Sequence, residues 1–274
     1  MPELPEVETT CRGVGPHIQD AKITQVIIRQ FSLRWPIADD LANILTGQTI
    51  HKVYRRAKYL LFQCGSGTLI IHLGMSGKLR ILDSTSITKA EKHDHVDIEF
   101  HNGQILRYND PRRFGCILWT SSPIEQHSLI RHLGPEPLTK QFDADYLWQQ
   151  SRSRRCSIKT LIMNGKIVVG VGNIYANEAL FLAKIHPKKR AHKLTKKNCS
   201  LLVTAIKTVL EQAIIAGGTT LKDFRKSDGK PGYFAQKLNV YGKEGETCPH
   251  CRSIIKHYKE TQRATYYCPL CQQN

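Results

Sequence analysis

The chain has 274 residues, a formal net charge of +17 and a sequence pI of about 9.6. This length allows two domains, 41% hydrophobic residues are enough for real cores, and such a basic chain suits a polyanionic partner, either nucleic acid or an anionic membrane surface. With no apolar run near the length of a membrane span and an acidic start unlike a signal peptide, we expect a cytoplasmic protein.

The first eight residues, Met-Pro-Glu-Leu-Pro-Glu-Val-Glu, place three carboxylates at the start of a basic chain. We expect Met1 to be removed because Pro2 is small, which leaves a free secondary amine. An α-amino group titrates near about 7.7–8.0, so part of it is neutral and nucleophilic at physiological pH. When this amine adds to a carbonyl carbon, the product is an iminium ion. The iminium has no N–H to lose, so it stays cationic and withdraws electrons from the neighbouring carbon. The alternative is that Pro5, Glu6 and Glu8 only begin a helix, and this segment alone leaves both open.

A helix followed by short strands is predicted for the first half of the chain. Apolar residues recur at helical spacing over residues 5–18, and a second, short helix is expected near 39–45. Apolar or alternating runs bounded by turn residues predict antiparallel strands at 23–28, 60–62, 69–71, 96–100, 105–108 and 117–119. This pattern is typical of a β-sandwich or barrel.

Helices replace strands after the Leu-Gly-Pro-Glu-Pro segment at 133–137. We predict a short helix at 158–163, a helix capped by Asn173, and a helix capped by Thr195 that ends at Gly217-Gly218. The loop that follows, at 217–232, is rich in glycine and charge and is long for a compact domain. Such loops are typical of lids and binding loops.

Four of the nine cysteines form a C-x2-C-x16-C-x2-C pattern near the end of the chain. This is the spacing of a structural zinc site with four thiolate ligands, here Cys248, Cys251, Cys268 and Cys271. Four thiolates complete the tetrahedron and leave no position for an activated water. The pattern therefore predicts one structural Zn²⁺ per chain, and we expect no organic cofactor.

Other segments are suited to nucleic acid, although each has a plainer structural interpretation on its own. The Gly-Val-Gly-Asn turn at 170–173 offers backbone N–H groups to phosphate, and the run at 184–197 contains seven cations and no acid. Two guanidiniums and a phenyl ring share the turn at 110–115, where an apolar side chain could enter a base stack. The turn at 74–77 exposes a methionine in the same way.

Taken together, the motifs resemble the formamidopyrimidine-DNA glycosylase family, and the resemblance runs from one terminus to the other. The segments that carry it are Pro-Glu-Leu-Pro-Glu-Val-Glu at 2–8, Arg-Arg-Ala-Lys-Tyr-Leu at 55–60, His-Leu-Gly-Met-Ser-Gly at 72–77, Asp-Pro-Arg-Arg-Phe-Gly at 110–115, Gly-Val-Gly-Asn-Ile-Tyr-Ala at 170–176, Gly-Gly-Thr-Thr-Leu at 217–221, and the cysteine hairpin with Gln-Arg-Ala-Thr-Tyr-Tyr-Cys at 262–268.

The resemblance implies an α+β multidomain fold. It would comprise an N-terminal antiparallel β-sandwich with an N-terminal helix, then a helical helix-two-turn-helix domain with a zinc-finger β-hairpin. On this basis we expect a catalytic domain over 1–131, a linker over 132–150, a DNA-binding domain with a lesion-capping loop over 151–235, and a zinc finger over 236–274.

The resemblance also implies a bifunctional DNA glycosylase and AP lyase of base excision repair that removes 8-oxoguanine and formamidopyrimidines. Pro2 would attack C1′ of the damaged nucleotide, and Glu3 would protonate the sugar ring oxygen. Lys58 matches the proton donor for β-elimination, and Arg263 matches the donor for δ-elimination. Because arginine is a poor acid, with a pKa above about 12, we favour phosphate positioning for Arg263.

The partner implied is double-stranded DNA with oxidised bases or abasic sites, bound by a monomer without membrane association. The DNA-contact positions are His93, Arg112, Arg155 and Asn173, and the residues that fill the gap left by a flipped-out lesion are Met75, Arg112 and Phe114. Position 155 is often lysine in relatives.

Two alternative functions belong with this interpretation. The endonuclease VIII branch shares the zinc hairpin and the proline chemistry but prefers oxidised pyrimidines, and it typically begins Pro-Glu-Gly-Pro where this chain has Pro-Glu-Leu-Pro. A non-catalytic zinc-ribbon DNA-binding protein is the other alternative, and the intact Pro2, Glu3 and Lys58 argue against it.

Overall fold

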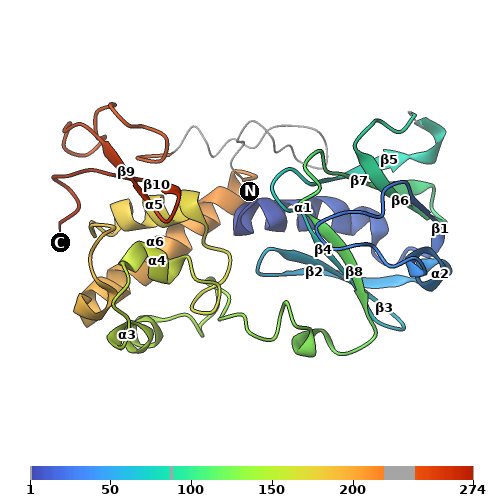
Figure 1. Cartoon of the computed structure of the whole chain (residues 1–274), viewed down its shortest axis with the longest axis horizontal. Helices are drawn as coiled ribbons and strands as arrows, with labels where there is room; N and C mark the ends of the chain where they lie inside the picture. Colours follow the sequence, from blue (N-terminus) through green and yellow to red (C-terminus); the bar gives the residue numbers. More distant parts are fainter. Residues whose placement is uncertain (1, 87–88, 219–237, 274) are drawn as a thin grey trace. The chain divides into compact units, whose positions relative to one another are not determined.

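The computed structural model describes residues 2–86, 89–218 and 238–273 of the chain (Figure 1). The chain divides into two compact units, which we describe separately. The first comprises Met1–Arg131 with Ala216–Tyr233, and the second comprises His132–Ile215 with Phe234–Asn274. The lesion-capping loop expected at 217–232 lies almost entirely outside the described residues.

The first unit is a β-sandwich of two antiparallel four-stranded sheets, as the sequence pattern predicts. One sheet has the strand order β1-β6-β7-β5 and the other has the order β2-β3-β4-β8. The strands are β1 (Ile23–Ile28), β2 (Ile50–Arg56), β3 (Tyr59–Cys64), β4 (Thr68–His72), β5 (Lys78–Asp83), β6 (Asp94–Phe100), β7 (Gln104–Asn109) and β8 (Cys116–Thr120). Two short 3₁₀ turns, η1 (Ser84–Ser86) and η2 (Ile124–Gln126), and the short helix α2 (Leu41–Leu45) complete this unit.

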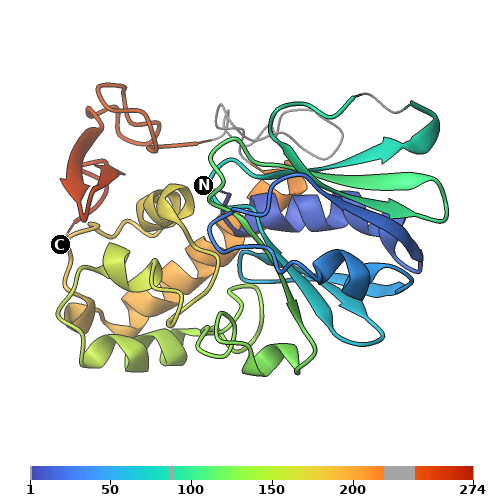
Figure 2. The same cartoon turned by 45° about the vertical axis from the view of Figure 1, so that its right-hand side comes forward.

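The N-terminal helix α1 (Leu4–Ile18) packs against both sheets (Figure 2). Its Val7, Cys11, Val14 and Ile18 recur at helical spacing, are buried, and join one apolar core with residues of both sheets. Each fully buried side chain of this kind contributes roughly 1.5–3 kcal/mol to stability. The core therefore fixes α1, and with it the direction in which the N-terminal residues enter the unit.

Strands β2 and β5 were not predicted, and both lie at a sheet edge. They read Ile-His-Lys-Val-Tyr-Arg-Arg and Lys-Leu-Arg-Ile-Leu-Asp, with only their first or second residue fully buried. Edge strands carry charged side chains that discourage pairing with other chains, and these charges obscure the period-2 signal. Backbone pairing with β3 and β7 decides their structure instead.

The second unit is helical and carries the cysteine hairpin. Its elements are α3 (Ala144–Arg152), α4 (Ile158–Ile162), α5 (Asn173–Leu182), η3 (Ala191–Lys193), α6 (Lys196–Ile215), β9 (Lys256–Glu260) and β10 (Arg263–Tyr267). Helix α3 was not predicted; the Asp143 side chain caps it by accepting a hydrogen bond from the N–H of Tyr146 at 2.7 Å. It begins inside the range expected to be a linker.

Helix α6 begins at the predicted cap, because Thr195 Oγ1 accepts a hydrogen bond from the N–H of Asn198 at 3.0 Å. Beyond α6, Gly217 and Gly218 have positive φ angles of 78° and 82°. By length and composition α6 could cross a membrane, although it contains no long uninterrupted apolar run. One apolar face of α6, which includes Leu202, Ile206 and Leu210, is buried, and the helix packs against α3 and α5.

The predicted cap of α5 was wrong by one residue. Gly172 is the N-cap, and Asn173 is the first residue of the helix. The Asn173 side chain does not cap: its Nδ2 donates a hydrogen bond to the backbone oxygen of Ala264 in the hairpin, at 3.0 Å. The asparagine therefore contacts the hairpin rather than closing its own helix.

Candidate functional site

The N-terminal residues are held by the start of α1. Pro2, Glu3 and Glu6 are buried, and Glu6 Oε2 accepts a hydrogen bond from the N–H of Glu3 at 2.8 Å. Glu3 and Glu6 form a reciprocal capping box in which Glu3 is the N-cap. Glutamate is not among the residues preferred at an N-cap, so helix capping alone does not explain a carboxylate at position 3.

Lys58 lies in the turn between β2 and β3, after Ala57 with a φ of 53°. The turn is tied to α1 through Arg55, which donates from Nη1 to the Ala57 oxygen at 2.9 Å and from Nε to Glu8 Oε2 at 2.8 Å. Burial opposes ionisation of Glu8, but hydrogen bonds from Arg55 and Arg12 outweigh it and lower the pKa of this carboxyl. A charged contact thus connects the turn bearing Lys58 to the helix that begins near Pro2.

His72, at the end of β4, is a residue to which the sequence assigned no role. Its Nδ1 accepts the N–H of Gly74 at 3.0 Å, and its ring lies 4.9 Å from the ring of Tyr59. Burial, followed by the positive charges of Lys58 and Arg34, lowers the pKa of His72 to about 4. The imidazole is therefore neutral at physiological pH, with its proton on Nε2.

The structure brings together the three residues predicted to fill a gap in DNA. Met75, Arg112 and Phe114 line one cavity of about 610 Å³ in the first unit, which His72 and Arg34 also line. Met75 and Phe114 are 38% and 46% exposed, so both present apolar surface to solvent. The Arg112 guanidinium lies over the Phe114 ring, 4.8 Å from its centroid.

The two turns that carry these residues are in backbone contact. Gly74 has a φ of 62°, and a Cβ at this position would lie 2.4 Å from the backbone nitrogen of Gly115. Only glycine permits this approach. His93, a further predicted DNA contact, joins the same group because its backbone oxygen accepts the N–H of Asp110 at 3.1 Å.

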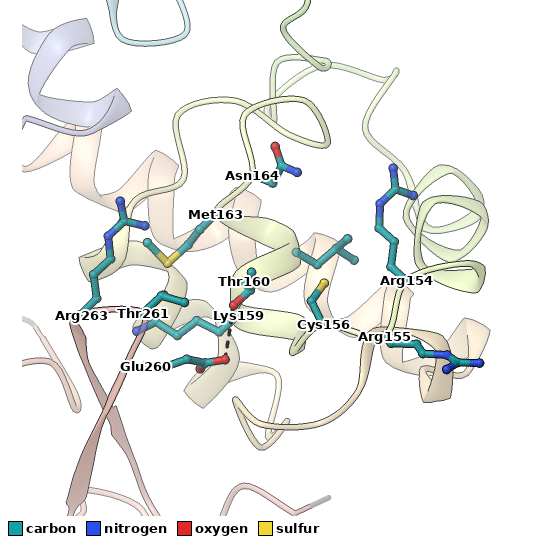
Figure 3. Close-up of a pocket in the computed structure, with 11 residues that line it drawn as sticks. Arg154, Arg155, Cys156, Lys159, Thr160, Met163, Asn164, Glu260, Thr261 and Arg263 are labelled. Carbon is teal, nitrogen blue, oxygen red and sulfur yellow. Dashed lines mark hydrogen bonds between the residues drawn. The ribbon is translucent and has the colours of Figure 1, made fainter.

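In the second unit, Arg155 and Arg263 line one pocket of about 530 Å³ (Figure 3). Arg154 and Lys159 add two further cations, and Glu260 is the single acid in the lining. Among the described residues, neither the Arg155 nor the Arg263 side chain has a hydrogen bond or ion pair, and both residues are exposed. The pocket is thus suited to an anion such as a backbone phosphate.

Arg263 stands at the tip of the β9–β10 hairpin. The two turn residues, Thr261 and Gln262, have φ angles of 45° and 61°, as a two-residue hairpin turn requires. Buried Lys159 secures the following strand: its Nζ donates to the Ala264 oxygen at 3.0 Å and to Thr265 Oγ1 at 2.7 Å.

Helix α5 holds the same hairpin strand through its asparagines. Asn177 Oδ1 accepts the N–H of Tyr266 at 2.8 Å, and Asn173 Nδ2 donates to the Ala264 oxygen. The buried carboxylate of Glu178 accepts the backbone N–H groups of Asn239, Val240 and Tyr241 at 2.8–2.9 Å. No sequence pattern had indicated these positioning roles of Lys159, Asn177 and Glu178.

The four predicted cysteines converge. Their sulfur atoms all lie within 4.8 Å of one another, with 3.8 Å between Cys248 and Cys271 and 3.4 Å between Cys251 and Cys268. Zn–S bonds of about 2.3 Å in a tetrahedron place sulfurs about 3.8 Å apart, so the donor set fits one zinc ion. Ser253 Oγ lies 3.1 Å from the sulfurs of both Cys251 and Cys268, in reach of two thiolates.

Family models match most of the chain. The formamidopyrimidine-DNA glycosylase N-terminal domain matches residues 1–117, the H2TH domain of the same enzymes matches 133–225, and the zinc finger found in FPG and IleRS matches 245–274. The last match agrees with the four-sulfur cluster, and the protein accordingly carries one structural zinc.

Curated relatives match over the full length. The formamidopyrimidine-DNA glycosylase of Hydrogenovibrio crunogenus is 55% identical over 273 residues, which cover 100% of this chain and 97% of the relative. That of Shewanella woodyi is 53% identical and covers 99% of both chains.

Solved structures match as well. MutM (Fpg) of Thermus thermophilus has a TM-score of 0.87 at 34% identity, covering 99% of this chain and 98% of the other. Lactococcus lactis Fpg in complex with DNA that contains N7-benzyl-Fapy-dG has a TM-score of 0.91 at 36% identity, and both chains are covered completely. The predicted α+β architecture is confirmed, and the chain belongs to the formamidopyrimidine-DNA glycosylase family.

Proposed function

We propose that this protein is a bifunctional DNA glycosylase and AP lyase of base excision repair that removes oxidised purines from duplex DNA. The observation that carries this function is full-length identity of 55% to a formamidopyrimidine-DNA glycosylase, with Pro2, Glu3 and Lys58 all present. Solved relatives bind DNA containing an abasic site or a damaged base, which supports the same class of partner.

Base removal begins at the amine of Pro2, once Met1 has been cleaved. Its lone pair attacks C1′ of the damaged nucleotide, and the N-glycosidic bond breaks with its electron pair leaving on the base. The departing base takes up the proton that the amine of Pro2 loses. Glu3 donates a proton to the sugar ring oxygen, so the C1′–O4′ bond opens and a cationic iminium forms between Pro2 and C1′. The hydrogen bond from Glu3 N–H to Glu6 supports this assignment, because it fixes the backbone next to the amine.

Strand cleavage follows from the persistent charge of the iminium. It acidifies the C2′ hydrogens; loss of one of these protons sends electrons toward the iminium and expels the 3′-phosphate by β-elimination. Lys58 donates a proton to the departing 3′-phosphate in this step. Arg263 binds the phosphate expelled in the subsequent δ-elimination; its exposed position at the hairpin tip supports binding rather than proton donation.

The DNA is bent and read by two sets of residues. Met75, Arg112 and Phe114 fill the space that the flipped-out nucleotide leaves, with Arg112 facing the opposite base. His93, Arg155 and Asn173 contact the phosphate backbone; one Asn173 N–H is used by the Ala264 oxygen, and its amide has a second for a phosphate.

The zinc ion holds the hairpin that presents Arg263 and takes no part in the chemistry. Acting on chromosomal DNA, the protein works in the bacterial cytoplasm at the nucleoid.

Borohydride trapping tests the function directly. Protein, a duplex with 8-oxoguanine opposite cytosine, and borohydride are incubated together, and we expect a covalent protein–DNA adduct that is absent without borohydride. Peptide mapping of the adduct locates the attachment point, which we expect to be residue 2. The Pro2→Gly variant replaces the secondary amine by a primary one and tests whether the proline itself is required. No adduct with the wild type would leave only a DNA-binding protein.

The same experiment distinguishes the proposed enzyme from an enzyme of the endonuclease VIII branch. An adduct with a thymine glycol duplex but not with 8-oxoguanine would place the protein with the endonuclease VIII branch. The purine-specific enzyme is favoured because this chain has Met75 together with Arg112 and Phe114, an arrangement that the endonuclease VIII branch lacks.

A further inference from the structure

One buried carboxylate lies at the centre of the DNA-reading part of the first unit. Asp110 is fully buried, and its two oxygens accept hydrogen bonds from different directions. Oδ1 accepts Ser76 Oγ at 2.6 Å, while Oδ2 accepts Tyr108 Oη at 3.0 Å and the N–H of Gly115 at 2.9 Å.

These bonds join two turns, which we call the gap-filling turns: residues 73–77, with Met75, and residues 110–115, with Arg112 and Phe114. Ser76 donates to Asp110 and also accepts the N–H of Arg112 at 3.2 Å, so one hydroxyl joins both turns. Gly115 follows Phe114 directly, and its N–H is held by Oδ2. Arg112 is therefore part of this network, Met75 is next to Ser76 in the sequence, and Phe114 is next to Gly115.

The backbone of Asp110 extends the network to His93, a further DNA-contact position, and to two neighbouring residues. Its N–H donates to the oxygen of His93, and its oxygen accepts the N–H of Arg113 at 3.2 Å. Buried His95 Nε2 lies 2.8 Å from the same oxygen. Arg113 has a φ of 55°, a conformation that L-residues rarely adopt and that the surrounding contacts maintain.

We propose that Asp110 is a positioning residue that holds the gap-filling turns in one arrangement, so that Met75, Arg112 and Phe114 enter the duplex together. The inference rests on the proposed function and adds a residue that touches neither DNA nor the reacting atoms. Insertion of three side chains into one gap needs a common geometry, and a carboxylate with donors from both turns supplies it.

The tests are Asp110→Asn, Ser76→Ala and Tyr108→Phe. Asn keeps the shape of Asp but removes the charge and one of the two acceptor oxygens, so the hydrogen bonds from Ser76, Tyr108 and Gly115 cannot all be kept at full strength. Ser76→Ala removes both links between the turns. Tyr108→Phe removes one bond to Oδ2 and leaves Gly115 N–H in place, so it is the mildest change. Ser151→Ala in α3, an equally buried serine whose Oγ donates to the Trp148 oxygen at 2.7 Å, is the matched control.

Two readouts separate positioning from general damage. The first readout uses an 8-oxoguanine duplex with 2-aminopurine beside the lesion. The fluorescence of 2-aminopurine rises when the gap-filling residues enter the duplex and unstack it. The single-turnover rate of base excision is measured on the same duplex. The second is borohydride trapping on a single-stranded abasic oligonucleotide, which needs the Pro2 chemistry but has no base stack to enter. Thermal unfolding confirms that each variant is folded.

For Ser76→Ala and Asp110→Asn we expect the fluorescence amplitude to fall by at least about half and excision to slow about tenfold or more, since small misplacements of positioned groups cost this much. Single-strand trapping should stay within about twofold of the wild type, and Tyr108→Phe should slow excision about threefold. If Asp110→Asn does not fold, the other two variants decide the matter.

If the folded Ser76→Ala and Tyr108→Phe variants show the fluorescence amplitude and the excision rate of the wild type, the proposal is wrong. Equal loss of duplex excision and single-strand trapping would also overturn the proposal, because the network would then support the whole catalytic site and not specifically the gap-filling residues. A wild-type protein that neither excises nor forms an adduct would instead reject the proposed function.

Discussion

Glu6 Oε2 accepts a hydrogen bond from the backbone N–H of Glu3 at 2.8 Å, and both residues are buried. One carboxylate thus holds the segment that carries the proposed nucleophile and its proton donor. Because the acceptor is a carboxylate, this bond is of the stronger, charge-assisted kind, worth about 1.5–3 kcal/mol.

Glu6→Ala should therefore slow adduct formation with an abasic duplex by about tenfold, whereas Glu6→Gln, which keeps an oxygen acceptor, should slow it less. Borohydride trapping under single-turnover conditions measures both. Thr9→Ala is a control from the same helix, since Thr9 Oγ1 only bonds to the Pro5 oxygen at 2.8 Å. Equal rates for Glu6→Ala and the control would show that the contact does not position the amine.

Retention of Met1 should abolish strand cleavage. A peptide nitrogen is not nucleophilic, so protein carrying an uncleaved N-terminal extension should form no adduct while still binding damaged DNA. The measurement is trapping beside fluorescence anisotropy on the same oligonucleotide. Normal trapping by the extended protein would refute the assignment of Pro2.

Because of His72, the free energy of unfolding should decrease as the pH is lowered. Its pKa is about 4 in the folded protein, below its ordinary value near 6.5. The unfolded chain therefore takes up the proton first, and the contribution of neutral His72, present above pH 6.5, is lost as the pH falls toward 4. A shift of this size corresponds to about 3 kcal/mol at most.

Urea unfolding at several pH values tests this contribution of His72. His72→Asn keeps an acceptor for the Gly74 N–H but does not titrate, so its free energy of unfolding should fall less than that of the wild type between about pH 7 and 4. Parallel curves for the two proteins would contradict the lowered pKa. The comparison cancels carboxylates common to both proteins, such as Asp94 and Asp97.

Loss of zinc should unfold the hairpin and weaken DNA binding. Buried apolar residues around the metal site form only a small cluster, with Phe181, Val240 and Ile255 beside Cys248 and Cys268. A core of this size does not hold a hairpin without its metal. Cys248→Ser should lose bound zinc and bind DNA at least about tenfold more weakly, measured by metal analysis and anisotropy.

Cys64→Ala, in buried strand β3, is the control for the metal site and should keep its zinc. Metal-free protein with unchanged affinity for DNA would argue against a structural role for the ion.

Binding should weaken steeply with salt, and Arg155 and Arg263 should account for part of the slope. Removal of one cation that neutralises a phosphate should decrease the slope of log K against log salt by about 0.9. Arg155→Gln and Arg263→Gln should each show this change, while Arg12→Gln, whose guanidinium pairs with Glu8, should not. Identical slopes for all three variants would place the phosphates elsewhere.

Several elements were predictable because their signal is local. The apolar period of α1, the strands β1, β6 and β7, and the Thr195 cap all depend on residues a few positions apart. The zinc site was predictable for the same reason, since two pairs of cysteines at fixed spacing already limit the geometry. Edge strands β2 and β5, and the contact of Asn173 with the hairpin, depend instead on distant partners.

The residues alone predict the chemical groups: an amine followed by a carboxylate, four thiolates, a lysine just before a strand, and an excess of arginine and lysine. Which of these groups meet depends on how the strands and helices pack. Asp110 and Ser76 are 34 residues apart, and Lys159 and Thr265 are 106 apart. A buried polar group must find a partner wherever folding places one, and no local pattern records that choice. The networks that position the reactive groups therefore emerge only when the strands and helices have packed.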